Sequence, residues 1–378
     1  MTTTSDCDKC GTPLPAALDP PRCGKCGKWF GPTTPRVDGH PRCEDEPGST
    51  PRSTPDAPDQ PLPTTHADFD QRYNRGQELA RGGMGVIYRA FDRVLRRPVA
   101  IKMRQVRPGR GDDPVMRGQF VREARVAGRL FHPNVIPVFD LGTDQLGQLY
   151  YTMRLVEGMN LERCLDALSS GVATRFTEFP LRRLVEAFVG VCRGVDYAHE
   201  SRILHLDLKP QNVLVSGFSE VFVIDWGLAR EEGSGEPDDL PHIYSAPGRE
   251  ETGSETRVAG RVIGTPAYMA PEQSLGAPSR LTPATDVYAL GGILHFILGG
   301  VPPNVNGATP TRTAPPLRPG IVPRGLQLPQ EHREAVRELI KICLRALEIH
   351  PANRYPDADG MVADLTDWLQ RTRGVIAQ

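Results

Sequence analysis

The chain has 378 residues, too many for one small core, and its formal net charge of −1 argues against a protein that binds a polyanion with its whole surface. Hydrophobic residues make up 39% of it, and the apolar runs are too short for a secretory signal or a membrane span, so we predict a cytoplasmic protein. Many of the 37 prolines lie before residue 66, which predicts that this part lacks a packed core.

Four of the eight cysteines lie in two CxxC pairs at the start of the chain: Cys7, Cys10, Cys23 and Cys26. Four thiolates at this spacing form the tetrahedral set that Zn²⁺ prefers. A module of about 25 residues cannot fold on its own apolar core, so bound zinc would supply the folding free energy. We predict a zinc ribbon over residues 1–30, with redox dithiols or an unstructured tail as the alternatives. Its aromatic and basic side chains suit a protein partner, and nucleic acid is not strongly indicated.

Residues 31–68 are rich in Pro, Thr, Ser and Asp and predict a disordered linker, followed by a globular domain over 69–372. The first part of this domain predicts strands over 86–92, 96–104, 135–144 and 149–156, with one helix over 116–131. Helices are then predicted over 184–200, 285–300, 333–347 and 357–372. Three single cysteines within helical patterns, Cys164, Cys192 and Cys343, are expected to be buried thiols. A small β-rich lobe before a larger helical lobe is an α+β fold with a cleft between the lobes.

The stretch "ELARGGMGVIYRA" places three glycines between two strand-like runs: Gly82, Gly83 and Gly85. Glycines let the backbone approach an anion closely, although an ordinary glycine-rich hairpin is an equal alternative. Lys102 ends the apolar run "VAIK", where a buried cation needs a partner, and Glu123 in the following helix is a candidate. The alternative for Lys102 is an edge position whose ammonium reaches water.

The stretch "HLDLKPQN" at 205–212 brings together a carboxylate, a cation and an amide, and "VIDWG" supplies a second carboxylate after a strand-like run. Mg²⁺ prefers hard oxygen ligands, which Asn212 and Asp225 can supply. Asp207 can accept a hydroxyl proton, and Lys209 can neutralise charge that grows on a transferred phosphoryl group. These residue types are those that a reaction of a magnesium-bound nucleotide needs.

Seven motifs occur in order along the globular region: "ARGGMG", "VAIK", Glu123, "HLDLKPQN", "DWG", "GTPAYMAPE" and "DVYALG". With them the chain resembles a eukaryotic-type protein kinase domain of the serine/threonine class common in bacteria. The resemblance implies a bilobal kinase fold and transfer of the ATP γ-phosphoryl group to Ser/Thr hydroxyls of proteins, in signal transduction. It also implies ATP and Mg²⁺ (or Mn²⁺) as cofactors, protein substrates as partners, and autophosphorylation.

The resemblance assigns roles by position. Asp207 would take the substrate proton, Lys209 would contact the γ-phosphate, and Thr265 would contact both residues. Lys102 would hold the α- and β-phosphates and pair with Glu123. The remaining nucleotide contacts would come from Leu79, Ala80, Gly82, Gly83, Gly85, Ile87, Ala100, Met153, Arg154, Val156 and Leu214. Structural roles are implied for Asp286 beneath the catalytic loop and for a pair formed by Glu272 and Arg354.

Four positions depart from the family pattern, and one of them, Ile87 in place of a valine, keeps its packing role. Ala80 replaces the first glycine of the loop, which is tolerable if its φ stays negative. Leu206 replaces the arginine that clamps a phosphorylated activation segment, so we expect activation without that clamp. Trp226 replaces a phenylalanine and must fit as a larger ring. The polar segment after Asp225 carries hydroxyls that are candidates for autophosphorylation or are incidental: Ser234, Ser245, Thr252, Ser254 and Thr256.

Two other functional classes are compatible with these residues. A pseudokinase scaffold would bind nucleotide and partners without turnover, but scaffolds of this fold usually lack at least one of the four residues Lys102, Asp207, Asn212 and Asp225. A zinc-ribbon adaptor with a secondary kinase fold is the third class, and the near-zero net charge argues against its nucleic-acid form.

Overall fold

The computed structural model describes residues 69–82, 85–105, 114–169, 181–216, 220–233, 266–274, 281–304 and 333–372. The predicted zinc ribbon with its four cysteines, the predicted linker, Gly83, Thr265 and the candidate hydroxyls between 234 and 256 lie outside these residues.

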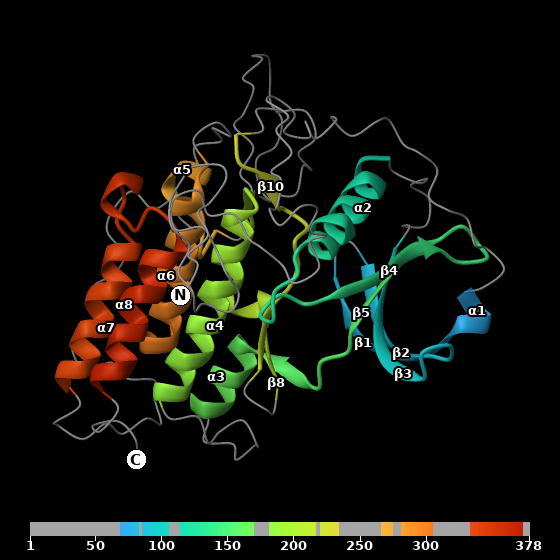
Figure 1. Cartoon of the computed structure of the whole chain (residues 1–378), viewed down its shortest axis with the longest axis horizontal. Coiled ribbons are helices and arrows are strands. Elements are labelled where there is room, and N and C mark those ends of the chain that lie inside the picture. Colours follow the sequence, from blue (N-terminus) through green and yellow to red (C-terminus); the bar gives the residue numbers. More distant parts are fainter. Residues whose placement is uncertain are drawn as a thin grey trace, which may run out of the picture. The chain divides into compact units, whose positions relative to one another are not determined.

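The first part of this region is a five-stranded antiparallel sheet with strand order β1-β2-β3-β5-β4 (Figure 1). Its strands are β1 (Tyr73–Arg81), β2 (Gly85–Asp92), β3 (Arg97–Arg104), β4 (Val138–Thr143) and β5 (Leu149–Arg154), preceded by the short helix α1 (Phe69–Arg72). Side chains alternate across β3, so Ala100 packs on the side of helix α2 (Pro114–Arg129) whereas Val99 and Ile101 pack on the other face with Phe69. The predicted β-rich lobe with one helix is confirmed.

One predicted strand was too long. The strand expected over 135–144 begins only at Val138, because Pro137 has no N–H to donate to a ladder. Instead, Val135 forms an isolated parallel bridge with Val223, and the N–H of Val223 donates to Asn134 O at 2.7 Å. The Asn134 side chain also donates to Val221 O at 3.1 Å. Residues 134–136 therefore join the sheet lobe to strand β9 (Val221–Val223) of the second lobe.

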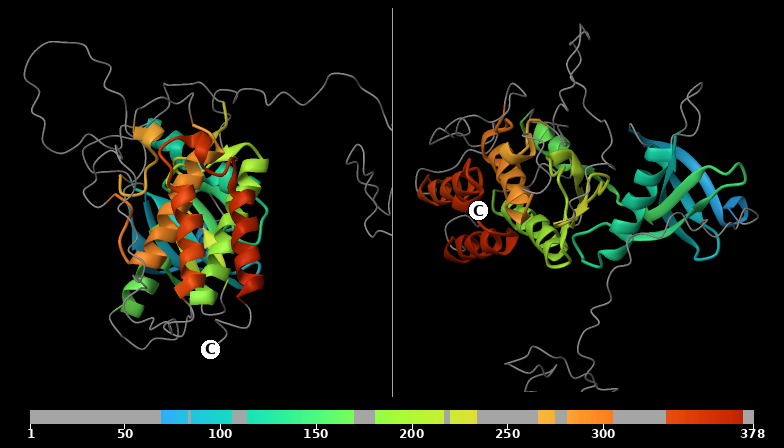
Figure 2. Two further views of the ribbon diagram at one scale, coloured as in Figure 1. Left: turned by 90° about the vertical axis from the view of Figure 1, so that its left-hand side faces the viewer. Right: turned by 90° about the horizontal axis from the view of Figure 1, so that it is seen from above.

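The second lobe is mainly helical. Its main helices are α3 (Leu161–Ser169), α4 (Leu181–Glu200), α6 (Pro283–Gly299), α7 (Arg333–Ala346) and α8 (Ala358–Arg371), with the single turn α5 (Pro271–Ser274). The short strands are β6 (Gly158–Asn160), β7 (Ile203–Leu204), β8 (Val213–Ser216), β9 and β10 (Arg230–Glu231), and two 3₁₀ turns are η1 (Pro210–Asn212) and η4 (Pro351–Asn353). The strands form the sheets β6-β8-β9 and β10-β7. Figure 2 shows α4, α6, α7 and α8 packed side by side.

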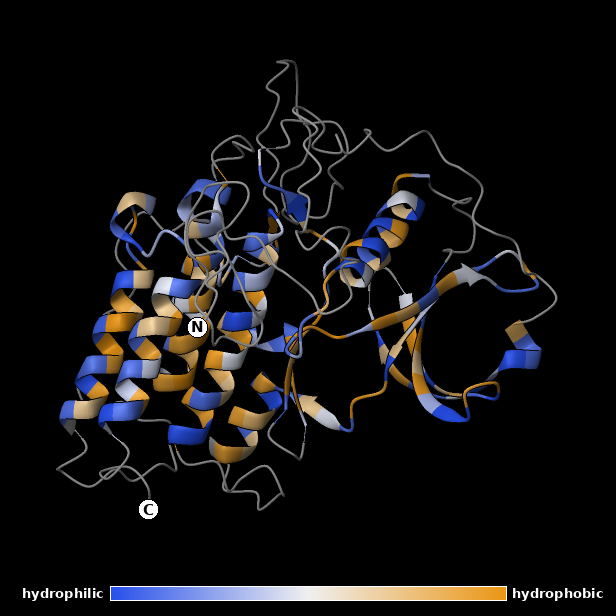
Figure 3. Ribbon diagram, in the orientation of Figure 1, coloured by the Kyte–Doolittle hydropathy of each residue, from blue (hydrophilic) through white to orange (hydrophobic). Residues whose placement is uncertain are grey.

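Helix α6 lies in the interior of this lobe, and most of its residues are hydrophobic (Figure 3). Every residue from Ala284 to Leu298 is buried, which is the pattern of a helix surrounded by other elements. Pro283 is tolerated at its first position, the N–H of Thr282 donates to Thr285 Oγ1 at 3.1 Å, and Gly300, with φ of 70°, ends the helix.

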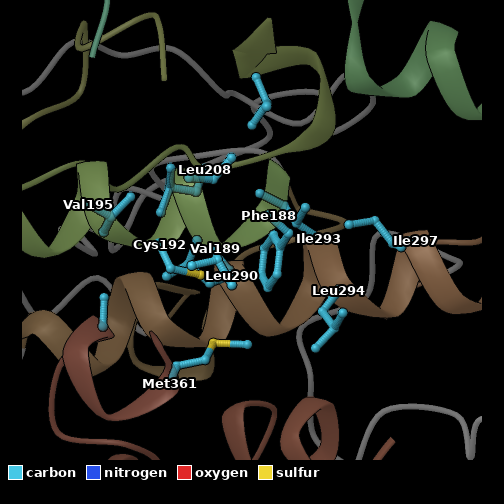
Figure 4. Close-up of a cluster of buried hydrophobic side chains, with 14 of the residues drawn as sticks. Phe188, Val189, Cys192, Val195, Leu208, Leu290, Ile293, Leu294, Ile297 and Met361 are labelled. Atoms are coloured by element: carbon cyan, nitrogen blue, oxygen red, sulfur yellow. The ribbon is translucent and has the colours of Figure 1, made fainter. Parts of the chain in front are cut away.

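Figure 4 shows how α4 contributes Phe188 and Cys192, and α6 contributes Leu290 and Ile293, to one apolar cluster that Met361 of α8 also joins. The three single cysteines predicted to be buried are buried, and burial raises the pKa of Cys164 to about 12. Among the described residues, no helix combines the length and hydropathy that a membrane crossing requires.

Candidate active site

The predicted catalytic loop is held from below by Asp286 of α6, which is 1% exposed. Its carboxylate accepts the backbone N–H groups of His205 at 2.7 Å and Leu206 at 2.8 Å, and it lies 3.0 Å from His199 Nε2. Burial alone would raise the pKa of Asp286, but the hydrogen bonds from His199 and the loop outweigh it and hold this pKa below its ordinary value. The predicted bracing role of Asp286 is confirmed, and it fixes the backbone just before Asp207.

Asp207 lies in a short network of charge-assisted hydrogen bonds. Lys209 Nζ donates to Asp207 Oδ2 at 2.6 Å, and Asn212 Nδ2 donates to Asp207 O at 2.8 Å. The Asp207 N–H donates to His205 Nδ1 at 3.2 Å. Leu206 before it has a φ of 64°, a strained conformation for a branched side chain that the Asp286 bonds help to impose. The loop thus holds a carboxylate and an ammonium side by side.

Asn212 connects this loop to Asp225. The N–H of Ile224, which directly precedes Asp225, donates to Asn212 O at 3.0 Å, and Ile224 O lies 3.1 Å from His205 Nε2. Asp225 itself has a φ of 64°, the second strained residue of the site. The structure therefore brings the segment of Asp225 next to the loop of Asp207 and Asn212, although the two motifs are separate in sequence.

The donor chemistry here fits a magnesium ion. Mg²⁺ takes oxygen ligands and usually keeps several waters, so one carboxylate, one amide oxygen and nucleotide phosphates suffice. Asn212 directs its Nδ2 at Asp207, which leaves its oxygen as the ligand atom. Within the described ranges, no cluster of three or more His, Cys, Asp or Glu side chains of the kind that holds a metal without a nucleotide is found.

Lys102 and Glu123 form the pair that the sequence suggested. Lys102 Nζ donates to Glu123 Oε1 at 2.6 Å, and the glutamate side chain is 2% exposed. Burial lowers the pKa of Lys102, but the carboxylates of Glu123 and Asp225 outweigh it and raise this pKa above its ordinary value. Burial and the Asp225 charge raise the pKa of Glu123, and the Lys102 ammonium opposes them. Asp225 therefore lies within electrostatic reach of the pair.

Three polar side chains in these networks were not predicted, the first being His199 beside Asp286. Tyr151 of β5 donates its hydroxyl to Glu123 Oε1 at 2.7 Å, and Gln273 of α5 donates Nε2 to Leu206 O at 2.9 Å. The alternation of "LYYTMR" already placed Tyr151 on the same face of its strand as Met153. The contact of Gln273 depends on packing between distant segments and has no sequence signal.

Five of the predicted nucleotide contacts share one apolar cluster on the α2 side of the sheet. Ala100 and Met153 are cross-strand partners in one apolar cluster, against which Ile87, Val156 and Leu214 pack. Gly85 has no space for a side chain, because a Cβ would collide with Met103 O. The N–H of Gly82 donates to Gly85 O at 2.9 Å and closes the turn. Leu79 and Ala80 lie exposed on β1.

Ala80 and Arg154 bear on two of the predicted roles. The φ angle of Ala80 is not positive, which is the condition under which an alanine is tolerated at this position. Arg154 donates its backbone N–H to Pro137 O at 3.1 Å, so this group is not available to a ligand. Its side chain is half exposed, donates twice to Glu220 and stacks on Phe222.

Leu206 and Trp226, which depart from the family pattern, are both buried. Leu206 is 3% exposed and packs with Leu204, Leu281 and the partly buried Leu228, in place of a cation. Trp226 is 1% exposed, and its ring centroid lies 4.6 Å from that of His205. Its Nε1 finds no hydrogen-bond acceptor among the described residues. The larger ring is accommodated in the apolar core of the helical lobe.

The predicted pair of Glu272 and Arg354 is confirmed as a bidentate salt bridge. Arg354 donates to both carboxylate oxygens at 2.7 and 2.9 Å and also to the carbonyls of Ala284, Glu348 and Ile349. Its side chain is 0% exposed, so the guanidinium depends entirely on these acceptors. The bridge ties α5 to the turn before α8.

A buried lysine–glutamate pair beside a loop that presents a carboxylate, an ammonium and an amide, between a small sheet lobe and a helical lobe, defines the protein kinase class. The protein kinase domain family model matches residues 73–358, and the chain belongs to this family.

Curated relatives and solved structures agree with this assignment. The serine/threonine-protein kinase PknD of Chlamydia abortus is 35% identical over 309 residues, which cover 79% of this chain and 31% of the relative. The PknD of Chlamydia pneumoniae is 35% identical over 293 residues, covering 71% of this chain and 30% of the relative. The chain thus spans about a third of the length of these relatives. The crystal structure of the M. tuberculosis PknI kinase domain superposes with a TM-score of 0.55 at 24% identity, covering 79% of this chain and 96% of that one, which supports the fold.

Proposed function

We propose that this chain is an active serine/threonine protein kinase that transfers the γ-phosphoryl group of ATP to protein hydroxyls. The observation that carries the proposal is the hydrogen bond from Ile224 N–H to Asn212 O, because it couples the segment of Asp225 to the loop of Asp207. The chain retains Lys102, Asp207, Asn212 and Asp225, of which a scaffold usually lacks at least one, and this supports an active enzyme. The names of the PknD relatives support the serine/threonine class.

The proposed chemistry assigns one task to each side chain. The substrate hydroxyl oxygen bonds to the γ-phosphorus, the bond to the β–γ bridging oxygen breaks, and Asp207 accepts the hydroxyl proton. Lys209 neutralises charge on the transferred group, and Lys102 holds the α- and β-phosphates. Magnesium, held by Asn212 and Asp225, would neutralise phosphate charge.

A direct test compares three proteins incubated with ATP, Mg²⁺ and a basic protein substrate. The wild type is expected to incorporate phosphate on serine and threonine, and Asp225→Asn to lose roughly 10²-fold or more of that rate. Asp367→Asn is the matched control, because Asp367 lies on the exposed face of α8 and pairs only with exposed Arg371. A wild type that binds nucleotide but transfers nothing would support the scaffold alternative instead.

We further propose that activation does not require a phosphate clamp at position 206. Leu206 belongs to an apolar cluster with Leu204 and Leu281, so position 206 itself supplies no guanidinium to bind a phosphorylated activation segment. Protein treated with a phosphatase and then freed of it is expected to keep at least about half of its initial kcat. A large loss of activity on dephosphorylation, restored by incubation with ATP, would contradict this proposal.

For the part before the kinase domain we propose a zinc ribbon over 1–30 and a linker over 31–68, ahead of a catalytic domain over 69–372. The spacing of Cys7, Cys10, Cys23 and Cys26 supports this division. Elemental analysis is expected to find about one zinc per chain in the wild type and none after Cys7→Ser with Cys10→Ser. Cys43→Ser is the matched control, because Cys43 lies in the linker, outside the two CxxC pairs. Zinc that survives the double replacement would argue against the ribbon. A cytoplasmic location and a protein partner for the ribbon remain predictions.

A further inference from the structure

Tyr151 lies directly opposite Lys102 in the sheet. The two residues are cross-strand partners between β3 and β5, so their side chains share the face that α2 covers. Tyr151 is 5% exposed there, and its ring centroid lies 5.2 Å from that of Phe120 on α2. This register places the tyrosine hydroxyl at the buried end of the Lys102–Glu123 pair.

Two donors meet at one oxygen of Glu123. Lys102 Nζ lies 2.6 Å and the Tyr151 hydroxyl 2.7 Å from Oε1, whereas Oε2 has no hydrogen-bond partner in the described part of the chain. Lys102 Nζ also lies 5.7 Å from the Tyr151 ring centroid. The tyrosine therefore interacts with both members of the pair, and its hydroxyl supplies one of the two hydrogen bonds described for this buried carboxylate.

The charges around Glu123 explain why the second donor matters. Lys102 on β3, Tyr151 on β5 and Asp225 after β9 are the groups that act on its carboxylate. Burial and the neighbouring Glu123 charge raise the pKa of Tyr151 well above its ordinary value, so the phenol stays a neutral donor. When the Lys102 ammonium directs some of its three N–H donors at phosphates, the tyrosine hydroxyl still satisfies Glu123.

We propose that Tyr151 is a positioning residue for nucleotide binding: its hydroxyl holds Glu123, and Glu123 holds Lys102 where the α- and β-phosphates bind. The proposal rests on the kinase function proposed above, and it concerns the phosphates of the nucleotide rather than the adenine or the protein substrate. Tyr151 does not touch the reacting atoms. It acts through Glu123 and so fixes the position of α2 relative to the sheet.

The test measures binding of MgADP and of adenosine by titration calorimetry to the whole chain. Tyr151→Phe keeps the buried ring and removes only the hydroxyl, so MgADP is expected to bind about tenfold more weakly, the usual size for a hydrogen bond to a charged group. Adenosine, which lacks phosphates, is expected to bind as it does to the wild type. Tyr150→Phe is the matched control, because Tyr150 is equally buried, at 5% exposed, but packs on the opposite face of the sheet.

A double replacement separates positioning from general stability. In a Glu123→Ala background, Tyr151→Phe is expected to cause no further loss of MgADP affinity, because the residue through which it acts is gone. Equal weakening of MgADP and adenosine, no weakening of either, or the same loss in both backgrounds would overturn the proposal. A wild type that binds MgADP but phosphorylates no protein would refute the kinase function and leave the role of Tyr151 in binding intact.

Discussion

Asp207→Asn is expected to lower kcat by roughly 10²–10⁴-fold, the usual contribution of a positioned general base. Asparagine keeps the shape of the side chain. The hydrogen bond from Lys209 to the side-chain oxygen and the one from Asn212 to the backbone carbonyl can therefore persist in part. The amide has no lone pair basic enough to take the substrate proton. The loss should therefore appear in kcat, whereas the affinity for MgADP should stay close to that of the wild type.

Steady-state kinetics with varied ATP, together with calorimetric titration of MgADP, would check this result. Gln211→Asn is not a suitable control, because Gln211 bonds to Glu162 next to the loop. Asp367→Asn on the far helix α8 is a better one and should leave both quantities unchanged. A kcat for Asp207→Asn within about threefold of the wild type would remove Asp207 from the role of base.

Arg354→Ala is expected to lower the free energy of unfolding by about 3–5 kcal/mol, the range seen when one partner of a buried ion pair is removed. The replacement leaves the Glu272 carboxylate, 7% exposed, without its partner, and it also leaves the carbonyls of Ala284 and Ile349 without their donor. Replacing both residues by apolar ones of similar size, Arg354→Met with Glu272→Leu, should cost less than Arg354→Ala alone, because no unpaired charge then remains buried.

Urea denaturation followed by circular dichroism measures these differences. The matched control is Arg371→Ala, which breaks an exposed pair with Asp367 on α8 and should change the free energy of unfolding by less than about 1 kcal/mol. An Arg354→Ala protein as stable as the Arg371→Ala protein would show that the bidentate bridge does not stabilise this lobe.

The sequence predicted the site well where chemistry and local pattern coincide. A lysine in an apolar strand requires a partner when it is buried, and Glu123 on the next helix was a candidate that the family resemblance also assigned to Lys102; the pair is observed. Asp286 and the pair of Glu272 and Arg354 followed from the family resemblance, and their contacts are observed.

What the sequence did not predict depends on register and on packing between distant segments. Tyr151 reaches Glu123 only because β3 and β5 pair with Lys102 opposite it, and a shift of one residue would turn it to the other face. Gln273 reaches Leu206 across 67 positions of chain. The strand predicted from residue 135 was too long. The prediction followed the apolar pattern, whereas Pro137 has no N–H to donate and the strand begins after it.

The attachment of Asn134 to β9 has a consequence for motion between the lobes. The covalent crossing after β5 and the bridge at residues 134–136 tie the small lobe to the large one at two separate places. Asn134 packs closely against α4 at Gly190 and Gly194: a Cβ at Gly190 would lie only 2.9 Å from the Asn134 side-chain nitrogen, and one at Gly194 would lie 3.1 Å from its carbonyl oxygen. We therefore expect residues 134–136 to move with the helical lobe whenever the small lobe rotates, because hydrogen bonds that join β9 to both the backbone and the side chain of Asn134 hold them there.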